Sequence, residues 1–131
     1  MFKANAVFSG FSVDNLEKAK EFYTKTLGLE LEDDKMGLQF KLPGGGSLFV
    51  YDKPDHQPAT YTALNFVVAN IDEAVDELAN SGVKFEHYDN LDLPAKPDDK
   101  GILRGLSVGQ GPDIAWFKDP AGNILSVLQD K

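Results

Sequence analysis

The chain contains two copies of one local pattern, and this internal repeat limits its possible folds more than any other feature. Residues 40–50 read FKLPGGGSLFV and residues 117–127 read FKDPAGNILSV, which share Phe, Lys, Pro, Gly, Leu and Val. Each copy predicts two strands joined by a Pro-x-Gly turn, so both are expected to be β-hairpins. Residues 12–16 match residues 67–71 in the same way, and the two matched blocks follow each other in the same order. The repeat therefore predicts a duplicated domain.

Both copies predict the order strand, helix, three strands. Asp14 or Asn15 is expected to cap the first helix, whose apolar stripe continues to Leu27 before Gly28 ends it. The elements expected in the first copy are a strand at 6–13, this helix, and strands at 29–33, 37–42 and 47–51. In the second copy they are a strand at 61–68, a helix at 71–81, and strands at 83–88, 113–118 and 124–129. We expect one domain, 1–131, with module one at 1–52, a linker at 53–60 and module two at 61–131.

The second module is longer than the first because it carries an inserted loop at residues 89–111. The hairpin blocks and the helix blocks repeat at different offsets, which places the extra residues between the second and third strands of this module. A loop of this length inside a compact domain is unusual and often covers a site. A meandering surface excursion is the alternative interpretation.

Composition excludes several classes of protein. The 131 residues include no cysteine, so disulfide scaffolds, thiolate zinc sites and cysteine nucleophiles are all excluded. A net charge of −8 is unsuitable for binding nucleic acid. No apolar run approaches the roughly 18 residues that a membrane helix needs, and residues 1–10 lack the layout of a signal peptide. The sequence thus predicts a soluble cytoplasmic protein with no nucleic-acid or membrane partner.

Two motifs resemble those of the vicinal oxygen chelate superfamily, which includes glyoxalase I, extradiol dioxygenases and the fosfomycin- and bleomycin-resistance proteins. The first motif is VDNL at 13–16 followed by FY at 22–23 and LG at 27–28, and the second is FKDPAGN at 117–123. The resemblance implies an α+β fold in which two βαβββ modules form a curled, half-open mixed-sheet barrel around a central cavity. It also implies a homodimer, because family members commonly pair modules between chains.

The resemblance identifies four positions at which metal-using members hold their ion. They carry His or Gln before the first helix of each module and Glu or His on each last strand, and this chain has Phe8, Ala63, Phe49 and Ser126 there. Divalent metals need oxygen or imidazole ligands, which neither Phe nor Ala supplies. We therefore expect no metal at the usual site and no cofactor.

Strand alternation predicts which side chains face the cavity. If Phe49 points inward, Leu48 and Val50 pack under the helix, and Phe40 and Phe117 also belong to the helix-facing core. Arg104, in the inserted loop, is a candidate for binding an anionic group of a ligand. The predicted ligand-binding residues are Phe8, Gln39, Phe49, Tyr51, Ala63, Asn65, Arg104, Ile114, Trp116 and Ser126. An apolar, aromatic lining with a few polar groups is typical of a small-molecule pocket.

Three functions are compatible with this pattern. The first is a metal-independent binding protein of the bleomycin-resistance type that holds a flat or aromatic molecule by stacking and polar contacts. The second is a glyoxalase- or dioxygenase-like enzyme, a lyase, isomerase or oxidoreductase, whose metal is displaced or absent. The third is a structural or interaction role in which aromatic side chains fill the cavity. The sequence identifies no catalytic residue, and so it favours the binding protein.

Overall fold

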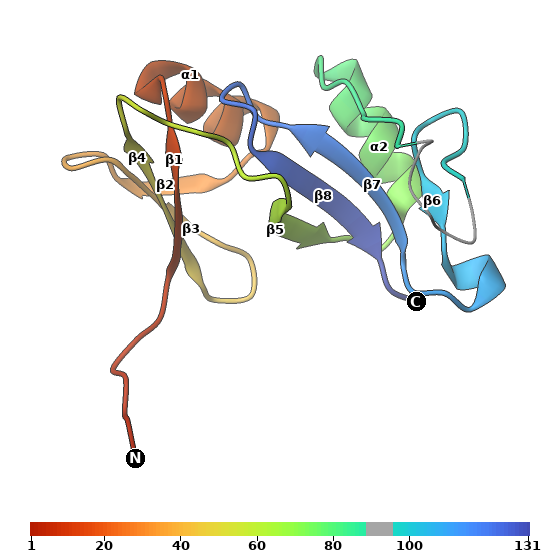
Figure 1. Ribbon diagram of the computed structural model, residues 1–131, viewed down its shortest axis with the longest axis horizontal. Helices are drawn as coiled ribbons and strands as arrows, with labels where there is room; N and C mark the ends of the chain where they lie inside the picture. Colours follow the sequence, from red (N-terminus) through yellow and green to blue (C-terminus); the bar gives the residue numbers. More distant parts are fainter. Residues whose placement is uncertain (89–95) are drawn as a thin grey trace. The chain divides into compact units, whose positions relative to one another are not determined.

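The strands form two four-stranded mixed sheets in a computed structural model that describes residues 1–88 and 96–131 (Figure 1). The first seven positions of the predicted inserted loop, 89–95, lie outside the described residues. The chain divides into two compact units, Met1–Pro58 and Ala59–Lys131, called unit 1 and unit 2 below. The division falls inside the predicted linker. Within the described ranges, no helix has both the length and the apolar character required to cross a membrane.

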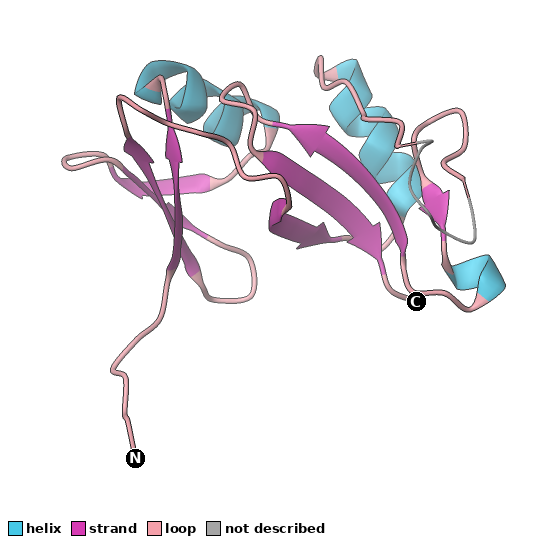
Figure 2. Cartoon of the chain, in the orientation of Figure 1, coloured by secondary structure: helices cyan, strands magenta, loops and turns pink. Residues whose placement is uncertain are grey.

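Both units have the predicted βαβββ order. Unit 1 contains β1 (Ser9–Val13), α1 (Leu16–Glu21), a π-helical turn η1 (Phe22–Thr26), β2 (Glu30–Asp33), β3 (Leu38–Lys41) and β4 (Ser47–Asp52). Unit 2 contains β5 (Thr62–Val67), α2 (Ile71–Asn80), β6 (Leu103–Arg104), a 3₁₀ turn η2 (Leu106–Val108), β7 (Asp113–Lys118) and β8 (Ile124–Gln129). The sheet orders β1-β4-β3-β2 and β5-β8-β7-β6 are equivalent, and the first pair of each is parallel. Figure 2 shows the same alternation of helix and strand in both.

The hydrogen bonds that cap the two helices repeat in the same way as the sequence. The side chain of Asn15 caps α1 by accepting from the Lys18 backbone N–H at 3.0 Å, and Asn70 caps α2 by accepting from that of Glu73 at 3.1 Å. Asn15 is thus the cap, which decides between the two predicted residues. Gly28 has a φ of +72°, the left-handed conformation expected where the helical segment stops.

The core of each unit lies between its helix and one face of its sheet. Leu48 and Val50 of β4 are fully buried, as is Phe40 of β3, whose ring lies 5.6 Å from that of Tyr23. In unit 2, α2 contacts β7 and β8 (Figure 1), and Phe117 and Leu125 are fully buried. The predicted alternation is therefore correct on both hairpins, which leaves the opposite sheet faces for other side chains.

The predicted strand at 83–88 is wrong. Phe85 forms only an isolated bridge with Phe117, and the Glu86 N–H donates to the Trp116 carbonyl oxygen at 2.8 Å. The outer strand is instead β6, which comes from the predicted inserted loop and pairs with the start of β7. The segment around Phe85 and the strand β6 thus lie along the same edge of β7. A strand of two residues is too short to show hydrophobic periodicity in the sequence.

The first helix also differs from the prediction. Regular α-helix ends at Glu21, and the chain continues as the π-helical turn η1 before Leu27. Tyr23 in this turn is fully buried, and its ring contacts those of Phe11, Phe22 and Phe40. The π-helical turn thus carries the central ring of a cluster of four, whereas α2 is regular throughout.

Candidate functional site

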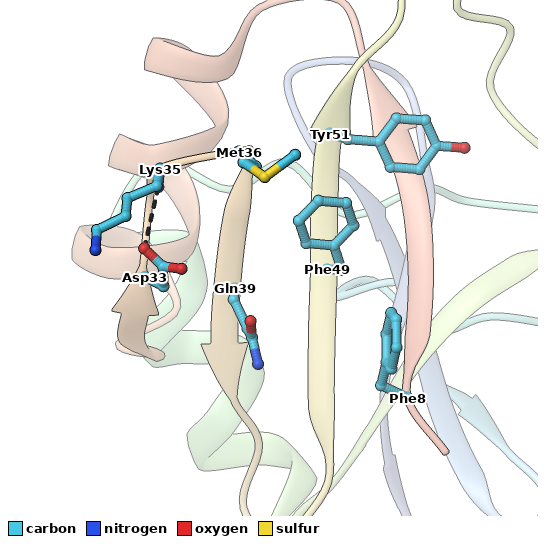
Figure 3. A pocket seen from close by; sticks show the side chains of 8 residues that line it. Phe8, Asp33, Lys35, Met36, Gln39, Phe49 and Tyr51 are labelled. Atoms are coloured by element: carbon cyan, nitrogen blue, oxygen red, sulfur yellow. Dashed lines mark hydrogen bonds between the residues drawn. The ribbon is translucent and has the colours of Figure 1, made fainter. Parts of the chain in front are cut away.

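A pocket of about 630 Å³ lies on the face of the unit 1 sheet opposite the buried side chains of β4 (Figure 3). Neighbouring strands position the side chains that line it. Gln39 lies in β3, Phe49 and Tyr51 lie in β4, and Phe8 directly precedes β1. The remaining lining residues, Asp33, Lys35, Met36 and Gly37, belong to the end of β2 and the turn that leads to β3. The structure thus brings together four of the predicted ligand-binding residues.

Aromatic rings form the floor of this pocket. The rings of Phe49 and Tyr51 lie 5.9 Å apart with an interplanar angle of 20°, whereas Phe8 meets Phe49 edge to face at 6.5 Å. Phe8 is 66% exposed and Tyr51 is 39% exposed, so a ligand can reach both rings. Exposed, nearly parallel rings favour stacking of a flat molecule.

Gly37 allows the ring of Phe49 to lie flat against the turn. A Cβ atom at Gly37 would stand only 2.8 Å from Cζ of Phe49, and the residue also has a φ of +130°. Both facts require glycine here. Gly37, Asp33, Lys35 and Met36 were not among the predicted ligand-binding residues. Strand alternation places Gly37 on the same face as Gln39 in the predicted strand at 37–42, so it could have been found, whereas Lys35 and Met36 lie in a turn, where alternation does not apply.

Polar groups lie at one side of the pocket. The Asp33 carboxylate accepts from the backbone N–H of Lys35 at 3.1 Å, which fixes the turn (Figure 3). Gln39 is exposed and displays an amide beside Phe49, its partner across the β3–β4 pair. The pocket therefore offers one carboxylate, one ammonium group and one amide around an aromatic floor.

Of the predicted ligand-binding residues of unit 2, only Trp116 lines a described pocket. Ser126 is fully buried and donates from Oγ to Oδ1 of Asn65 at 2.5 Å, and it pairs with Trp116 across the β7–β8 hairpin. Ile114 pairs with Leu128 and Leu103 in the same sheet. Trp116 lines a smaller pocket of about 240 Å³, with Thr60, Tyr61, Thr62, Tyr88 and Ile124.

An irregularity in β5 changes which side chain meets Trp116. Thr62 pairs with Ile124 and Leu64 with Leu125, so the register shifts at Ala63. Because of this bulge, Thr62 accepts a hydrogen bond from Nε1 of Trp116 at 3.1 Å. Ala63 was expected to face the cavity together with Asn65, and nothing in the sequence signals the bulge. A ligand contact for Ala63 stays a prediction.

Arg104 is engaged with carboxylates of its own unit. Its guanidinium donates two hydrogen bonds to Asp72 of α2, at 2.8 and 3.0 Å, and a third to Asp98 at 3.2 Å. This bidentate contact lowers the pKa of Asp72 to about 2. The predicted contact between Arg104 and an anionic ligand stays untested, and the contacts present join the inserted loop to α2.

The four positions at which metal-using members of the vicinal oxygen chelate superfamily bind their ion do not provide metal ligands in this chain. Phe8 and Phe49 are in contact in unit 1, and Ser126 is bonded to Asn65 in unit 2. Within residues 1–88 and 96–131, no group of three or more His, Cys, Asp or Glu side chains is arranged to hold an ion. His56 lies elsewhere, half-buried, with Nδ1 2.6 Å from Oγ of Ser12.

Comparisons with known proteins agree with this architecture. A family model described as the Glyoxalase/Bleomycin resistance protein/Dioxygenase superfamily matches residues 7–127. A comparison with curated proteins finds no match.

Solved structures share the fold across the whole chain. A glyoxalase family protein from Bacillus anthracis is 19% identical with a TM-score of 0.69, and the match covers 100% of this chain and 98% of that one. FosX, a fosfomycin resistance protein from Listeria monocytogenes, is 16% identical with a TM-score of 0.68, covering 99% and 96%. TnmS3, an antibiotic binding protein from Streptomyces sp. CB03234, is 26% identical with a TM-score of 0.67, covering 99% and 100%.

The family match includes both βαβββ units and both motifs on which the resemblance was based. The chain therefore belongs to the glyoxalase/bleomycin resistance protein/dioxygenase superfamily.

Proposed function

We propose that this chain is a metal-independent, cytoplasmic small-molecule binding protein of the bleomycin-resistance type, which holds a flat or aromatic ligand on the sheet of unit 1. The observation that carries the proposal is the aromatic floor of a pocket of about 630 Å³, formed by the exposed rings of Phe8 and Tyr51 and the half-buried ring of Phe49. This volume lies within the range of about 300–1,000 Å³ that is usual for drug-sized ligands. The similarity to TnmS3, an antibiotic binding protein, supports the same class of function.

Charge favours a cationic ligand over an anionic one of the same shape. The net charge of −8 raises the local concentration of cations, whereas the one acidic and one basic side chain that line the pocket, Asp33 and Lys35, cancel in charge. Gln39 can orient a ligand by hydrogen bonds through its amide. Stacking is expected to provide most of the affinity and the polar groups most of the selectivity.

Calorimetric titration with two flat probes, 9-aminoacridine and anthraquinone-2-sulfonate, tests this proposal. We expect saturable binding of the cationic dye, and weaker binding of the anionic one. Phe49→Leu keeps an apolar side chain but removes the stacking ring, so it should weaken binding about tenfold. Val108→Ala is the control, because Val108 is exposed and does not line the pocket. Absence of saturable binding by either dye, or equal affinity of Phe49→Leu and the wild type, would contradict the proposal.

Metal analysis of the purified protein distinguishes the proposal from the enzyme alternative. A glyoxalase- or dioxygenase-like enzyme that has moved its metal should carry about one ion per chain after purification in metal-supplemented buffer. We expect far less than one, and we expect dye affinity to be unchanged by a chelator. Stoichiometric metal together with chelator-sensitive binding would favour the enzyme.

A further inference from the structure

Unit 2 contains a pocket with a different chemistry from the one on unit 1. It lies where β5 and β8 begin and β7 ends, and its volume of about 240 Å³ is below the range usual for drug-sized molecules. Its described lining, Thr60, Tyr61, Thr62, Tyr88, Trp116 and Ile124, includes three aromatic rings and no charged side chain. Such a pocket suits a small ligand or a small group at the end of a larger one.

Two of the rings form a fixed corner. The rings of Trp116 and Tyr88 lie 5.5 Å apart with an interplanar angle of 68°, and Nε1 of Trp116 donates to Thr62. This hydrogen bond uses the only donor of the indole, so Trp116 offers the pocket a π surface. Tyr61, adjacent to Thr62 in the chain, is 71% exposed and supplies the third ring.

The hydroxyl of Tyr88 is a buried polar group without a hydrogen-bond partner among the described residues. Leaving such a group unsatisfied costs about 1–3 kcal/mol, so native proteins rarely do so without a reason. Burial raises the pKa of Tyr88, and the carboxylate of Glu86 raises it further, so the hydroxyl stays protonated at neutral pH. A ligand that enters the corner and carries a polar atom would satisfy this hydroxyl.

Charges near the pocket favour a positive ligand. The backbone N–H of Glu86 donates to the Trp116 carbonyl, which places this acidic residue beside the corner, and its carboxylate pairs with Lys118 at 3.3 Å. Of these two charges, the carboxylate has the larger effect on Tyr88. Aromatic faces attract cations through their quadrupole, and Trp does so most strongly.

We propose that this pocket is a second binding site that takes a small tertiary or quaternary ammonium compound carrying a hydrogen-bonding group. The cation would lie against the faces of Trp116 and Tyr61, and its polar group would bond to the Tyr88 hydroxyl. The two pockets belong to different units and their described linings share no residue, so this proposal does not depend on the function proposed for unit 1.

Choline and its neutral carbon analogue 3,3-dimethylbutan-1-ol test the proposal at constant ionic strength. The chain has one tryptophan, so its fluorescence reports on this corner alone. We expect a saturable change with choline, and binding about tenfold weaker for the neutral analogue. Equal affinity for the two compounds, or no saturable change with choline up to about 100 mM, would overturn the proposal.

Two variants locate the binding. Tyr88→Phe removes only the hydroxyl and should weaken the binding of choline and of 3,3-dimethylbutan-1-ol by about the same factor, roughly fivefold, because both compounds carry the alcohol that bonds to it. Phe49→Leu, in the other pocket, should leave choline affinity unchanged, just as Tyr88→Phe should leave binding of 9-aminoacridine unchanged. A Tyr88→Phe protein that binds choline as the wild type does would contradict the role of the hydroxyl. Loss of choline binding in Phe49→Leu would place the cation in unit 1 and overturn the second site.

Discussion

Asp119 shows how a carboxylate of the FKDPAGN motif serves the hairpin turn. Its side chain is 5% exposed, and Oδ1 accepts from the backbone N–H groups of Ala121 and Asn123, both at 2.9 Å. Oδ2 accepts from Nδ2 of Asn123 at 3.0 Å. These bonds close the β7–β8 hairpin, so Asp119 stabilises the strand that carries Ser126 without touching either pocket.

Replacing this carboxylate should destabilise the protein without changing its ligand chemistry. Asp119→Ala leaves buried donors unpaired, and we expect it to lower the free energy of unfolding by about 3 kcal/mol. Urea denaturation followed by circular dichroism measures the loss. Glu17→Ala, on the exposed first turn of α1, is the control and should have little effect. A loss below about 1 kcal/mol in Asp119→Ala would mean that the hairpin does not depend on these bonds.

Gly37 is the residue on which the aromatic floor of unit 1 most directly depends. Gly37→Ala would force its Cβ against the ring of Phe49, which stands 2.8 Å away, in a backbone conformation that L residues avoid. We expect a loss of about 1–3 kcal/mol of stability and weaker binding of 9-aminoacridine. Gly44→Ala is the matched control, because Gly44 also has a positive φ but no atom within 4 Å of its Cβ position. If both variants bind the dye equally well, the ring position does not matter for binding.

At the scale of elements, a cluster of charges ties the inserted loop to α2. Arg104 lies in the loop and pairs with Asp72 in the first turn of the helix, and Lys100 lies 2.9 Å from Asp76 one turn later. Exposed ion pairs of this kind stabilise little individually. Together they hold β6 against β7 and so complete the sheet that carries Trp116.

This cluster predicts a dependence of stability on pH. Arg104 lowers the pKa of Asp72 to about 2 from a normal value of 3.8, so the stabilisation is present above pH 4 and disappears as the pH falls towards 2. The Asp72 side chain is 46% exposed, and we expect less than about 1 kcal/mol from it. Urea unfolding of wild type and Asp72→Asn should differ at pH 6, and the difference should shrink to about a third at pH 2.5. In an Arg104→Gln background, the stability difference caused by Asp72→Asn should be small at both pH values. If Asp72→Asn changes the stability of the wild type equally at both pH values, Arg104 is not the cause of the lowered pKa of Asp72.

The elements that were predictable are those whose pattern recurs. Helix caps, hairpin turns and the alternation of Leu48 and Val50 with Phe49 follow from local sequence, and they place Phe8, Gln39, Phe49 and Tyr51 in one pocket. The π-helical turn, the bulge at Ala63 and the two-residue β6 depend on packing and on distant hydrogen bonds. Tyr61 and Tyr88 were missed for the same reason, because one precedes a strand and the other belongs to a segment wrongly predicted as one.

At the scale of the whole molecule, exposed apolar side chains favour self-association. Phe2 and Val7 are 88% and 85% exposed, and both lie in the segment before β1, next to Phe8 of the unit 1 pocket. Association that removes these apolar side chains from water is favourable. We therefore expect a homodimer, with a mass about twice 14.4 kDa by sedimentation equilibrium. Phe2→Ser combined with Val7→Ser should shift the equilibrium towards monomer, while a wild-type protein that sediments as a monomer would contradict this expectation.

The parallel pairings of β1 with β4 and of β5 with β8 also have a kinetic consequence. Ser9 pairs with Leu48 and Thr62 with Ile124, so unit 2 must close a loop of about 60 residues where unit 1 closes one of about 40. The entropy of loop closure grows only with the logarithm of length, and the difference is about 0.4 kcal/mol. Nucleation of the second sheet should thus be only about twofold slower than that of the first. Residues inserted between α2 and β7 therefore lower the stability of the sheet only slightly. This connection is the place where a fold of this kind tolerates insertions.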